Sequence, residues 1–306
     1  MTLRLSIFNT SSNLPLFAAE QAGCFAHHGV AVAWSQTPNS DTQRDGLAKG
    51  DFDLAIAAMD NALALIDVAG QDVVVVCGGD GGMNDLMAKP DIARIEDLRG
   101  KTLGVDAPNT AFALVGRKIL ADRGLLLERD YQLALTGGTG PRAAALASNP
   151  DIAAAMINPP FTFKLQEQGL HSLGNQFDLI GPYQGSTSFA MRDWVHAHTE
   201  QLTRYLAAYI EGQRMVLSPA HRPAMLALLT THFKLSDSAA ENTLAALLTK
   251  GSGLAQDAAL NDQGFASTLA IRGELLGLQR LQADSAPSAC LDLNAYRQAL
   301  QLARTI

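Results

Sequence analysis

The feature of this sequence that most constrains its fold is a recurring unit of apolar strand, polar turn and helix. The clearest copy combines the strand Thr102–Val105, a Pro-containing turn at residues 106–110 and a helical pattern over residues 111–123 that Gly124 ends. Similar turns follow other strand-like runs at residues 9–13, 59–61, 137–142 and 158–160. Alternation of strands and helices predicts an α/β fold with mostly parallel sheets.

These turns also predict where a ligand binds. A helix start leaves backbone N–H groups without an intrahelical partner, so it suits a polar or anionic ligand group. Ligands of open α/β sheets bind at the carboxyl ends of the strands, where these turns lie. We therefore expect the turns to face one cleft.

The remaining elements follow from hydrophobic period and capping signals. Predicted strands cover residues 3–8, 30–34, 53–57, 73–76, 85–88, 102–105, 131–135, 153–157, 179–181 and 186–192. Residues 73–76 are all valine, which predicts a strand covered on both faces of a parallel sheet. Ser40 with Gln43, and Ser238 with Glu241, have capping-box spacing. Predicted helices cover residues 15–22, 40–50, 60–68, 111–123, 141–148 and 160–168, and then a helical tail from residue 199 with an apolar face formed by Leu202, Tyr205, Leu206, Tyr209 and Ile210.

Composition excludes several classes of protein. The chain has 306 residues and a net charge of −7, and no Lys/Arg-rich block argues for nucleic acid as a partner. Its three cysteines form neither a metal-binding spacing nor a disulfide framework. No apolar run reaches 18 residues, and no secretory signal is visible. We expect a periplasmic protein if a signal segment was removed, and a cytoplasmic one otherwise.

Four stretches carry a resemblance to a known family. Leu16 to Phe25, followed by Gly29, is similar to the family's opening helix and its exit, with Cys24 where an aromatic residue is usual. Residues 46–55 resemble its step from helix through glycine and acid to strand, and residues 95–105 its entry to the second lobe. Residues 152–160 resemble the strand and double-proline turn that line the cleft. Over residues 3–220 the chain thus resembles the sulfonate/nitrate/taurine and thiamine-pyrimidine-precursor group of type II periplasmic solute-binding proteins.

The resemblance implies two α/β lobes, each a mixed and mostly parallel sheet flanked by helices. Lobe 1 would contain residues 1–88 and 188–306, with the C-terminal helices packed on it, and lobe 2 residues 89–187. Hinge motion near Lys89 and residues 186–189 would close the lobes on a small polar organic molecule, which an ABC importer permease would then receive. The resemblance implies a monomer with no cofactor, no metal and no catalytic residue.

The expected ligand-binding residues lie in the polar turns and nearby. Three acids, Asp60, Asp80 and Asp106, disfavour a simple anion and suit an amine, an amidine-like heterocycle or a hydroxylated ligand, unless they serve as helix caps. Arg142 would pair with a carboxylate or sulfonate, or else lie in solvent. Tyr183 would stack on a ring or belong to the core. The full set is Asn9, Thr10, Ser11, Asn13, Gln36, Asp60, Asn61, Asp80, Asn84, Asp106, Asn109, Thr110, Ala111, Phe112, Gly138, Thr139, Arg142, Asn158, Tyr183 and Gln184.

One motif and two alternative functions have to be weighed against this hypothesis. Residues 138–143 fit G-x-G-x-x-A, but no acid follows at the end of the next strand, so a dinucleotide site is not expected. The first alternative is an intracellular enzyme of the same fold, of desulfinase, decarboxylase or pyrimidine-synthase type. It would use the thiol of Cys24 with His27 or His28 within hydrogen-bond reach. A ligand-sensing domain of a regulator is a weaker third hypothesis.

Overall fold

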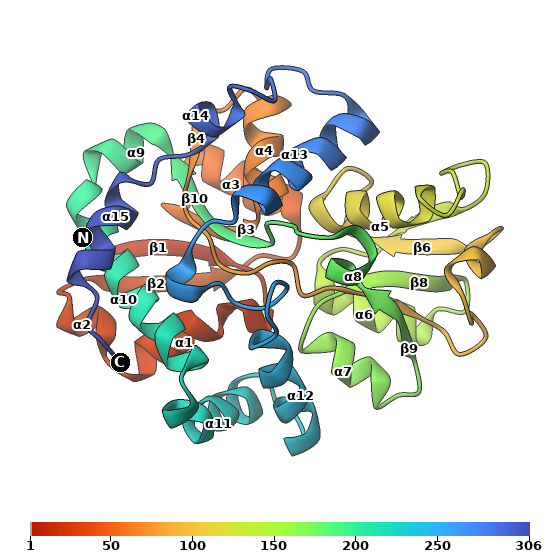
Figure 1. Ribbon diagram of the computed structural model, residues 1–306, viewed down its shortest axis with the longest axis horizontal. Helices are drawn as coiled ribbons and strands as arrows, with labels where there is room; N and C mark the ends of the chain where they lie inside the picture. The colour runs from red at the N-terminus through yellow and green to blue at the C-terminus, as the bar shows by residue number, and fades with distance from the viewer. Residues whose placement is uncertain (1) are drawn as a thin grey trace.

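A computed structural model describes residues 2–306 and shows two α/β lobes side by side (Figure 1). The first lobe is built on a five-stranded sheet of order β2-β1-β3-β10-β4. Strands β1, β2 and β3 are parallel, whereas β10 runs antiparallel to β3 and β4. The bounds are β1 Thr2–Ile7, β2 Ala31–Gln36, β3 Leu54–Ala58, β4 Val73–Cys77 and β10 Ser186–Met191.

The second lobe has a matching sheet of order β7-β6-β8-β5-β9. Strands β6, β7 and β8 are parallel, and β5 runs antiparallel to β8 and β9. The bounds are β5 Asp85–Ala88, β6 Thr102–Val105, β7 Gln132–Leu135, β8 Ile152–Ile157 and β9 His171–Asn175. The predicted fold class, two lobes with mixed and mostly parallel sheets, is confirmed.

Strand pairing moves the boundary between the lobes. Because β5 pairs with β8 and β9, the chain enters the second sheet before Asp85, rather than after the predicted residue 88. The chain returns to the first sheet with β10, which begins at Ser186. The two crossings therefore run through residues 78–84 and 181–185, next to each other, since Gly185 N donates to Asp80 O at 2.9 Å.

Helices cover both sheets (Figure 1). Those of the first lobe are α1 Leu14–Gln21, α2 Cys24–His27, α3 Ser40–Lys49 and α4 Met59–Asp67, and those of the second are α5 Ala111–Ala121, α6 Thr139–Ser148, α7 Phe161–Gln166 and α8 Gln176–Ile180. The C-terminal helices are α9 Arg192–Ala197, α10 Thr199–Leu217, α11 Arg222–His232, α12 Asp237–Leu247, α13 Asp262–Leu276, α14 Ala286–Cys290 and α15 Asn294–Leu302. Short 3-10 helices occur at η1 Ser11–Asn13, η2 Ile95–Leu98, η3 Pro219–His221 and η4 Gln256–Ala258.

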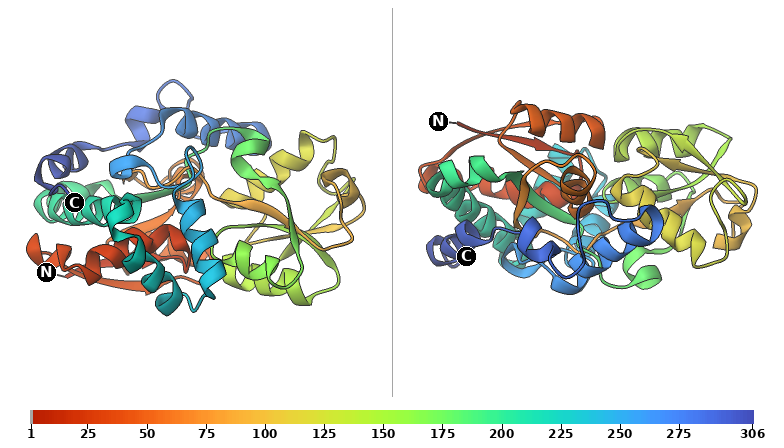
Figure 2. Two further views of the ribbon diagram at one scale, coloured as in Figure 1. Left: turned by 60° about the horizontal axis from the view of Figure 1, so that its bottom comes forward. Right: turned by 90° about the horizontal axis from the view of Figure 1, so that it is seen from above.

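Helix α10 anchors this C-terminal part on the first lobe. Its predicted apolar face is fully buried, and α10 packs along α1. Gly212 makes this close approach possible, because a Cβ there would lie 2.1 Å from the carbonyl oxygen of Pro15. Both termini lie at the end of the molecule away from the second lobe (Figure 2). Among residues 2–306, no helix has the length and apolar character needed to cross a membrane.

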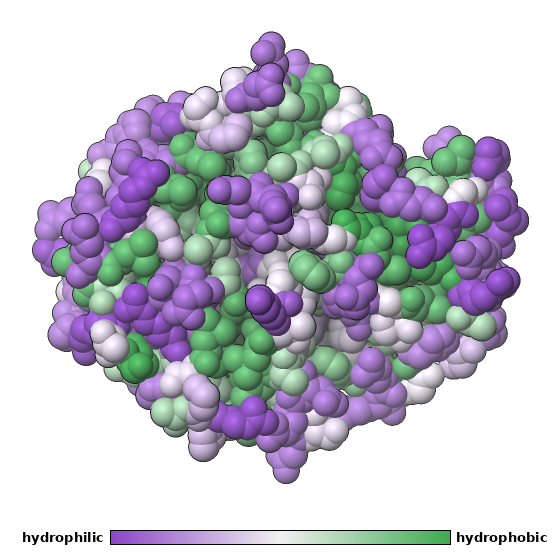
Figure 3. Space-filling model, in the orientation of Figure 1, coloured by the Kyte–Doolittle hydropathy of each residue, from purple (hydrophilic) through white to green (hydrophobic). Residues whose placement is uncertain are grey.

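The resemblance implied that the tail packs on the first lobe alone, but the tail contacts both lobes. Helix α13 contacts both α4 and α5, and α12 contacts α7 of the second lobe. Lys118 of α5 donates to Glu274 of α13 at 3.1 Å, and Lys164 of α7 donates to the carbonyl of Phe233 at 2.9 Å. The tail therefore bridges the lobes, and Figure 3 shows a notch between them at the upper right of the molecule.

Several local predictions were wrong. Residues 179–181, predicted as a strand, end helix α8, and the missed strand β9 lies just before it. The β9 sequence is only half-buried and contains no apolar run, so periodicity gave no signal. Strand β4 is covered on both faces, but it is an edge strand antiparallel to β10, and the segment at Leu291 shields its free edge.

The two helix caps also differ from the predicted capping boxes. Asn39, not Ser40, caps α3, and its side chain accepts from Thr42 N at 2.8 Å. The Gln43 amide instead donates to the carbonyl of Ser6 at 2.9 Å inside the first lobe. Ser236, not Ser238, caps α12 by accepting from Ala239 N at 3.1 Å.

Candidate functional site

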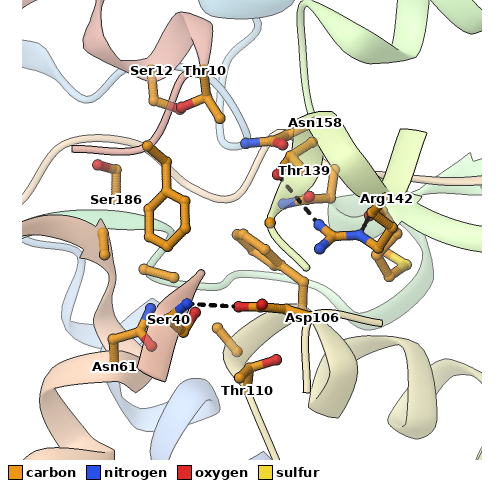
Figure 4. A pocket seen from close by; sticks show the side chains of 18 of the residues that line it. Thr10, Ser12, Ser40, Asn61, Asp106, Thr110, Thr139, Arg142, Asn158 and Ser186 are labelled. Carbon is orange, nitrogen blue, oxygen red and sulfur yellow. Dashed lines mark hydrogen bonds between the residues drawn. The ribbon is translucent and has the colours of Figure 1, made fainter. Parts of the chain in front are cut away.

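A cavity of about 60 Å³ lies between the lobes at the carboxyl ends of their parallel strands (Figure 4). Polar turns of both lobes line it, as the sequence predicts. Since a buried water needs roughly 10–15 Å³, the cavity has room for about four to six water-sized groups. The predicted ligand residues that line it are Thr10, Asn13, Asn61, Asp80, Asn84, Asp106, Thr110, Ala111, Phe112, Gly138, Thr139, Arg142 and Asn158.

Asp80 provides the acidic group on the side of the crossings. Its Oδ1 accepts from Gly82 N at 2.8 Å and from Ser186 N at 3.2 Å, and this fixes the carboxylate in place. Gly185 has to be a glycine here, because a Cβ would lie 2.1 Å from that oxygen. The second oxygen, Oδ2, is buried and has no hydrogen-bond partner. Burial raises the pKa of Asp80, and the bonds from Gly82 and Ser186 and the nearby Ser12 hydroxyl oppose that rise.

Three asparagines add further unpartnered polar atoms to the cavity. Asn84 is 1% exposed, and neither its amide nitrogen nor its amide oxygen has a partner. Asn13 donates to the carbonyl of Phe8 at 2.6 Å, but its Oδ1 is unpartnered, as is Oδ1 of Asn158. Buried polar groups in native proteins are nearly always hydrogen-bonded. These atoms therefore point to a polar ligand that would complete their bonding.

The second lobe contributes two helix starts. The Thr110 side chain turns back to the carbonyl of Ala107 at 2.9 Å instead of capping α5. The first-turn N–H groups of residues 111–113 thus have no intrahelical acceptor, and these residues line the cavity. Helix α6 begins beside them at Thr139, after Gly138, again without a side-chain cap. Both starts make this wall favourable for a negatively charged ligand group.

Arg142 of α6 lies on the same wall, 3% exposed. Its guanidinium donates to the carbonyls of Met156 at 2.9 Å and Gly137 at 3.0 Å and to the Thr139 hydroxyl at 3.3 Å (Figure 4). Burial lowers its pKa to about 10, against the opposing charge of Asp106. Arg142 is therefore not a solvated helix residue, which was the alternative left open by the sequence.

Three hydrogen bonds join the lobes around the cavity. Asp106 Oδ2 accepts from Ser40 N, at the start of α3, at 3.0 Å (Figure 4). Gly138 N donates to the carbonyl of Pro38 at 3.1 Å, and Ser11 N to the carbonyl of Pro159 at 3.1 Å. The lobes are thus closed over the cavity.

Asn9 and Gln36 lie outside the inner cavity. They line an adjoining cavity with Pro38, next to the Gly138 bond. Asn109 is exposed and lines a different groove, between helices α3 and α4 of the first lobe, the 107–110 turn of the second lobe and α13, and its side chain accepts from Arg117 at 3.0 Å. The sequence indicated the region in which these residues lie, but not whether their side chains point into the inner cavity.

Four further predicted ligand residues do not line the cavity. Asp60 is held by Arg272 of α13 through bonds of 2.7 and 2.9 Å, and neither side chain is more than 2% exposed. Tyr183 is 1% exposed and belongs to the core of the second lobe. The Gln184 amide donates to the carbonyls of Asp80 and Ser186, which ties the crossings together. Ser11 is fully buried beside the cavity and does not line it.

The sequence analysis missed part of the lining. Ser12 lies inside the predicted turn at residues 9–13, Ser40 is part of a predicted capping box and Ser186 begins a predicted strand, so each stood in a predicted element but was not selected as a ligand residue. The apolar residues gave no signal that separates cavity walls from core. The missed residues are Phe8, Ser12, Ser40, Ile56, Ala57, Ala58, Met83, Gly104, Val105, Ala113, Met156 and Ser186.

Cys24 is remote from this cavity. It is fully buried at the start of α2, and burial raises its thiol pKa to about 11, so it is not a ready thiolate. His28 bonds to Glu211 at 2.8 Å rather than to the thiol. This environment does not favour a nucleophilic role for Cys24. Within residues 2–306, no group of three or more His, Cys, Asp or Glu residues is placed to hold a metal ion.

Comparisons with known proteins agree with this architecture. The model of the NMT1-like family matches residues 1–230, whereas no curated protein sequence matches the chain. The periplasmic nitrate-binding protein NrtA from Synechocystis PCC 6803 superposes with a TM-score of 0.83 at 14% identity, over 98% of this chain and 88% of that one. The alkanesulfonate-binding protein SsuA from Xanthomonas axonopodis pv. citri, bound to MOPS, gives 0.74 at 18% identity, over 92% and 97%.

A third structure shows that the fold also occurs in an enzyme. DSZB, in complex with biphenyl-2-sulfinic acid, superposes with a TM-score of 0.65 at 15% identity, over 99% of this chain and 100% of that one. At these identities the matches show the fold alone, which is the type II periplasmic binding protein fold, as predicted.

Proposed function

This chain belongs to the NMT1-like family, and we propose that it is a solute-binding protein that captures a small polar organic molecule between its lobes and delivers it to an ABC importer. The observation that supports this proposal most is the closed cavity. Both lobes line it, and buried polar atoms with no partner face it from Asp80, Asn84, Asn13 and Asn158. A ligand that bonds to both walls stabilises the closed arrangement over the open one.

Binding fits the cavity lining better than chemistry does. The lining contains no cysteine, histidine or lysine, so it lacks the thiol and imidazole pair on which the enzyme hypothesis depended. The enzyme alternative also loses Cys24, the residue on which it depended. The likeness to DSZB is a likeness of fold, and sites on one fold differ in chemistry.

The proposed mechanism is hinge closure. The two crossings, residues 78–84 and 181–185, contain several glycines, and in the described chain they are the two places where the chain passes from one sheet to the other. Rotation there would open the three hydrogen bonds around the cavity and admit the ligand. A permease that recognises the closed lobes, and a periplasmic location like that named for NrtA, belong to the same proposal.

Native mass spectrometry followed by denaturation tests this proposal. We expect a discrete small molecule to be released unchanged, and we expect small-angle scattering to show a smaller radius of gyration when that compound is added back to emptied protein. A compound that is chemically altered by the protein would support an enzyme instead. Tight binding without any change in scattering would contradict hinge closure.

A further inference from the structure

The cavity contains one buried acidic and one buried basic side chain that are not paired with each other. Asp80 is 4% exposed, and it accepts from two backbone N–H groups, with the Ser12 hydroxyl beside it. Arg142 is 3% exposed and donates to two carbonyls and a hydroxyl. Across residues 2–306, neither side chain forms a salt bridge. Because an unpaired buried charge is strongly unfavourable, each of them favours a ligand group of opposite charge.

These two charges lie on different walls. Figure 4 shows Arg142 on the opposite side of the cavity from Ser186, and Ser186 N holds the Asp80 carboxylate. The third ionisable group, Asp106, is bonded to the start of α3 through Ser40, and its charge also acts on Arg142 without forming a salt bridge to it. A single anion would satisfy Arg142 and leave Asp80 unpaired, whereas a single cation would do the reverse.

The uncharged groups of the lining are mixed. Unpartnered oxygens of Asn13, Asn84 and Asn158 and Oδ2 of Asp80 are acceptors, which suit a ligand with several N–H donors, and the Asn84 amide nitrogen is an unpartnered donor. Near Arg142, the starts of α5 and α6 present N–H donors, which suit a carboxylate. The volume of about 60 Å³ favours a small ligand.

We propose that the ligand is a small amino carboxylate, with its ammonium group at Asp80 and Asn84 and its carboxylate at Arg142 and the α5 and α6 starts. This inference rests on the proposed function and names the ligand class of the same cavity. It differs from nitrate and the sulfonates, which the titles of the structural neighbours name. One molecule with both charges would pair both buried side chains at once.

Isothermal titration calorimetry with a graded series of probes tests the proposal. The series is glycine, β-alanine and 4-aminobutyrate, and its controls are propionate and propylamine, which each carry one charge. We expect one amino carboxylate to bind best, with a length that reports the distance between the walls. Both singly charged controls should bind at least tenfold more weakly. Equal binding of propionate, or no binding by any amino carboxylate, would overturn the proposal.

A charge variant separates recognition from structure. Asp80→Asn keeps an oxygen for Gly82 N and Ser186 N but removes the charge. We expect it to weaken binding of the preferred amino carboxylate by about 10- to 150-fold, the range for a hydrogen bond to a charged group, and to leave propionate binding unchanged. The matched control is Asp85→Asn, because Asp85 is a partly buried acid that lines a different cavity. It should change neither affinity.

The outcomes also separate this inference from the proposed function. An equal loss for both probes in Asp80→Asn would show a structural role and overturn the inference. Release of an unrelated anion in native mass spectrometry, together with lobe closure on that anion, would overturn the amino carboxylate while leaving the solute-binding function intact. Absence of closure with every bound compound would contradict the function itself.

Discussion

The bond between Asp106 and the start of α3 is the one cross-lobe contact at the cavity that involves a charged side chain. Asp106 Oδ2 accepts from Ser40 N at 3.0 Å, whereas the other two contacts join backbone groups. A hydrogen bond to a charged group contributes roughly 1.5–3 kcal/mol, and a carboxylate at a helix N-terminus lies in the same favourable field. We therefore predict that Asp106→Ala shifts the unliganded lobes from closed to open by about 10- to 150-fold.

Single-molecule FRET can read these populations directly. Dyes at Lys49→Cys and Gln132→Cys would report the distance between the lobes, since both positions are exposed and lie on different sheets or their flanking helices. The three native cysteines are buried and should not be labelled in the folded protein. Asp106→Ala should raise the fraction of the low-transfer, open state.

The matched control is Asp41→Ala on α3, the helix whose start Asp106 contacts. Asp41 pairs with Arg44 within α3 and makes no bond across the cavity, so its removal should leave the populations unchanged. Identical populations in Asp106→Ala and the unaltered protein would refute the argument. Equal shifts in both variants would show that the net charge near α3, and not the bond, controls closure.

Three further predictions concern stability and reactivity. Arg272→Met leaves Asp60 buried and unpaired, so urea denaturation should show a free energy of unfolding lower by roughly 3–5 kcal/mol. Adding Asp60→Leu should restore part of that loss. A loss below about 1 kcal/mol would contradict a buried ion pair. Burial acts to raise the pKa of Glu211, but hydrogen bonds from Arg304 and His28 outweigh burial and lower the pKa from an ordinary 4.5 to about 2. The ionised Glu211 therefore stabilises the folded protein fully above pH 4.5, and this contribution is lost as the pH falls through about 2. Glu211→Gln should thus be less stable by roughly 2–3 kcal/mol at pH 7, with a gap to the unaltered protein that narrows below pH 4.5, and a gap independent of pH would exclude this ionisation. Burial raises the thiol pKa of Cys24 and Cys77 to about 11 and that of Cys290 to about 12. A thiol reagent at about pH 8 should therefore modify all three cysteines only after unfolding. Rapid labelling of Cys24 in the native protein would support the enzyme hypothesis instead.

Local pattern made the units of the fold predictable. An apolar run with a polar turn and a helical period carries its own signal, so most strands and helices and the position of the turns were predicted correctly. The resemblance then gave the fold class. Strand β9 escaped prediction because its burial depends on β5, from a distant part of the chain, and its own sequence shows no pattern.

Long-range contacts decided which turn residues are free to bind a ligand. Asp60 and Asp80 are the same residue type, each directly after a strand of the first sheet, and the sequence alone treats them alike. Arg272, 212 positions further along the chain, neutralises Asp60. Within residues 2–306 no salt bridge is formed by Asp80, and its Oδ2 remains unpartnered.

The sequence by itself therefore determined the α/β units, their polar turns and the presence of a site at the strand ends, because these depend on neighbours along the chain. Only the tertiary structure decided the strand order, the point where the chain crosses between lobes and the side chains left without partners. Those properties depend on how distant segments pack, and hydrogen bonding and charge are completed only by that packing.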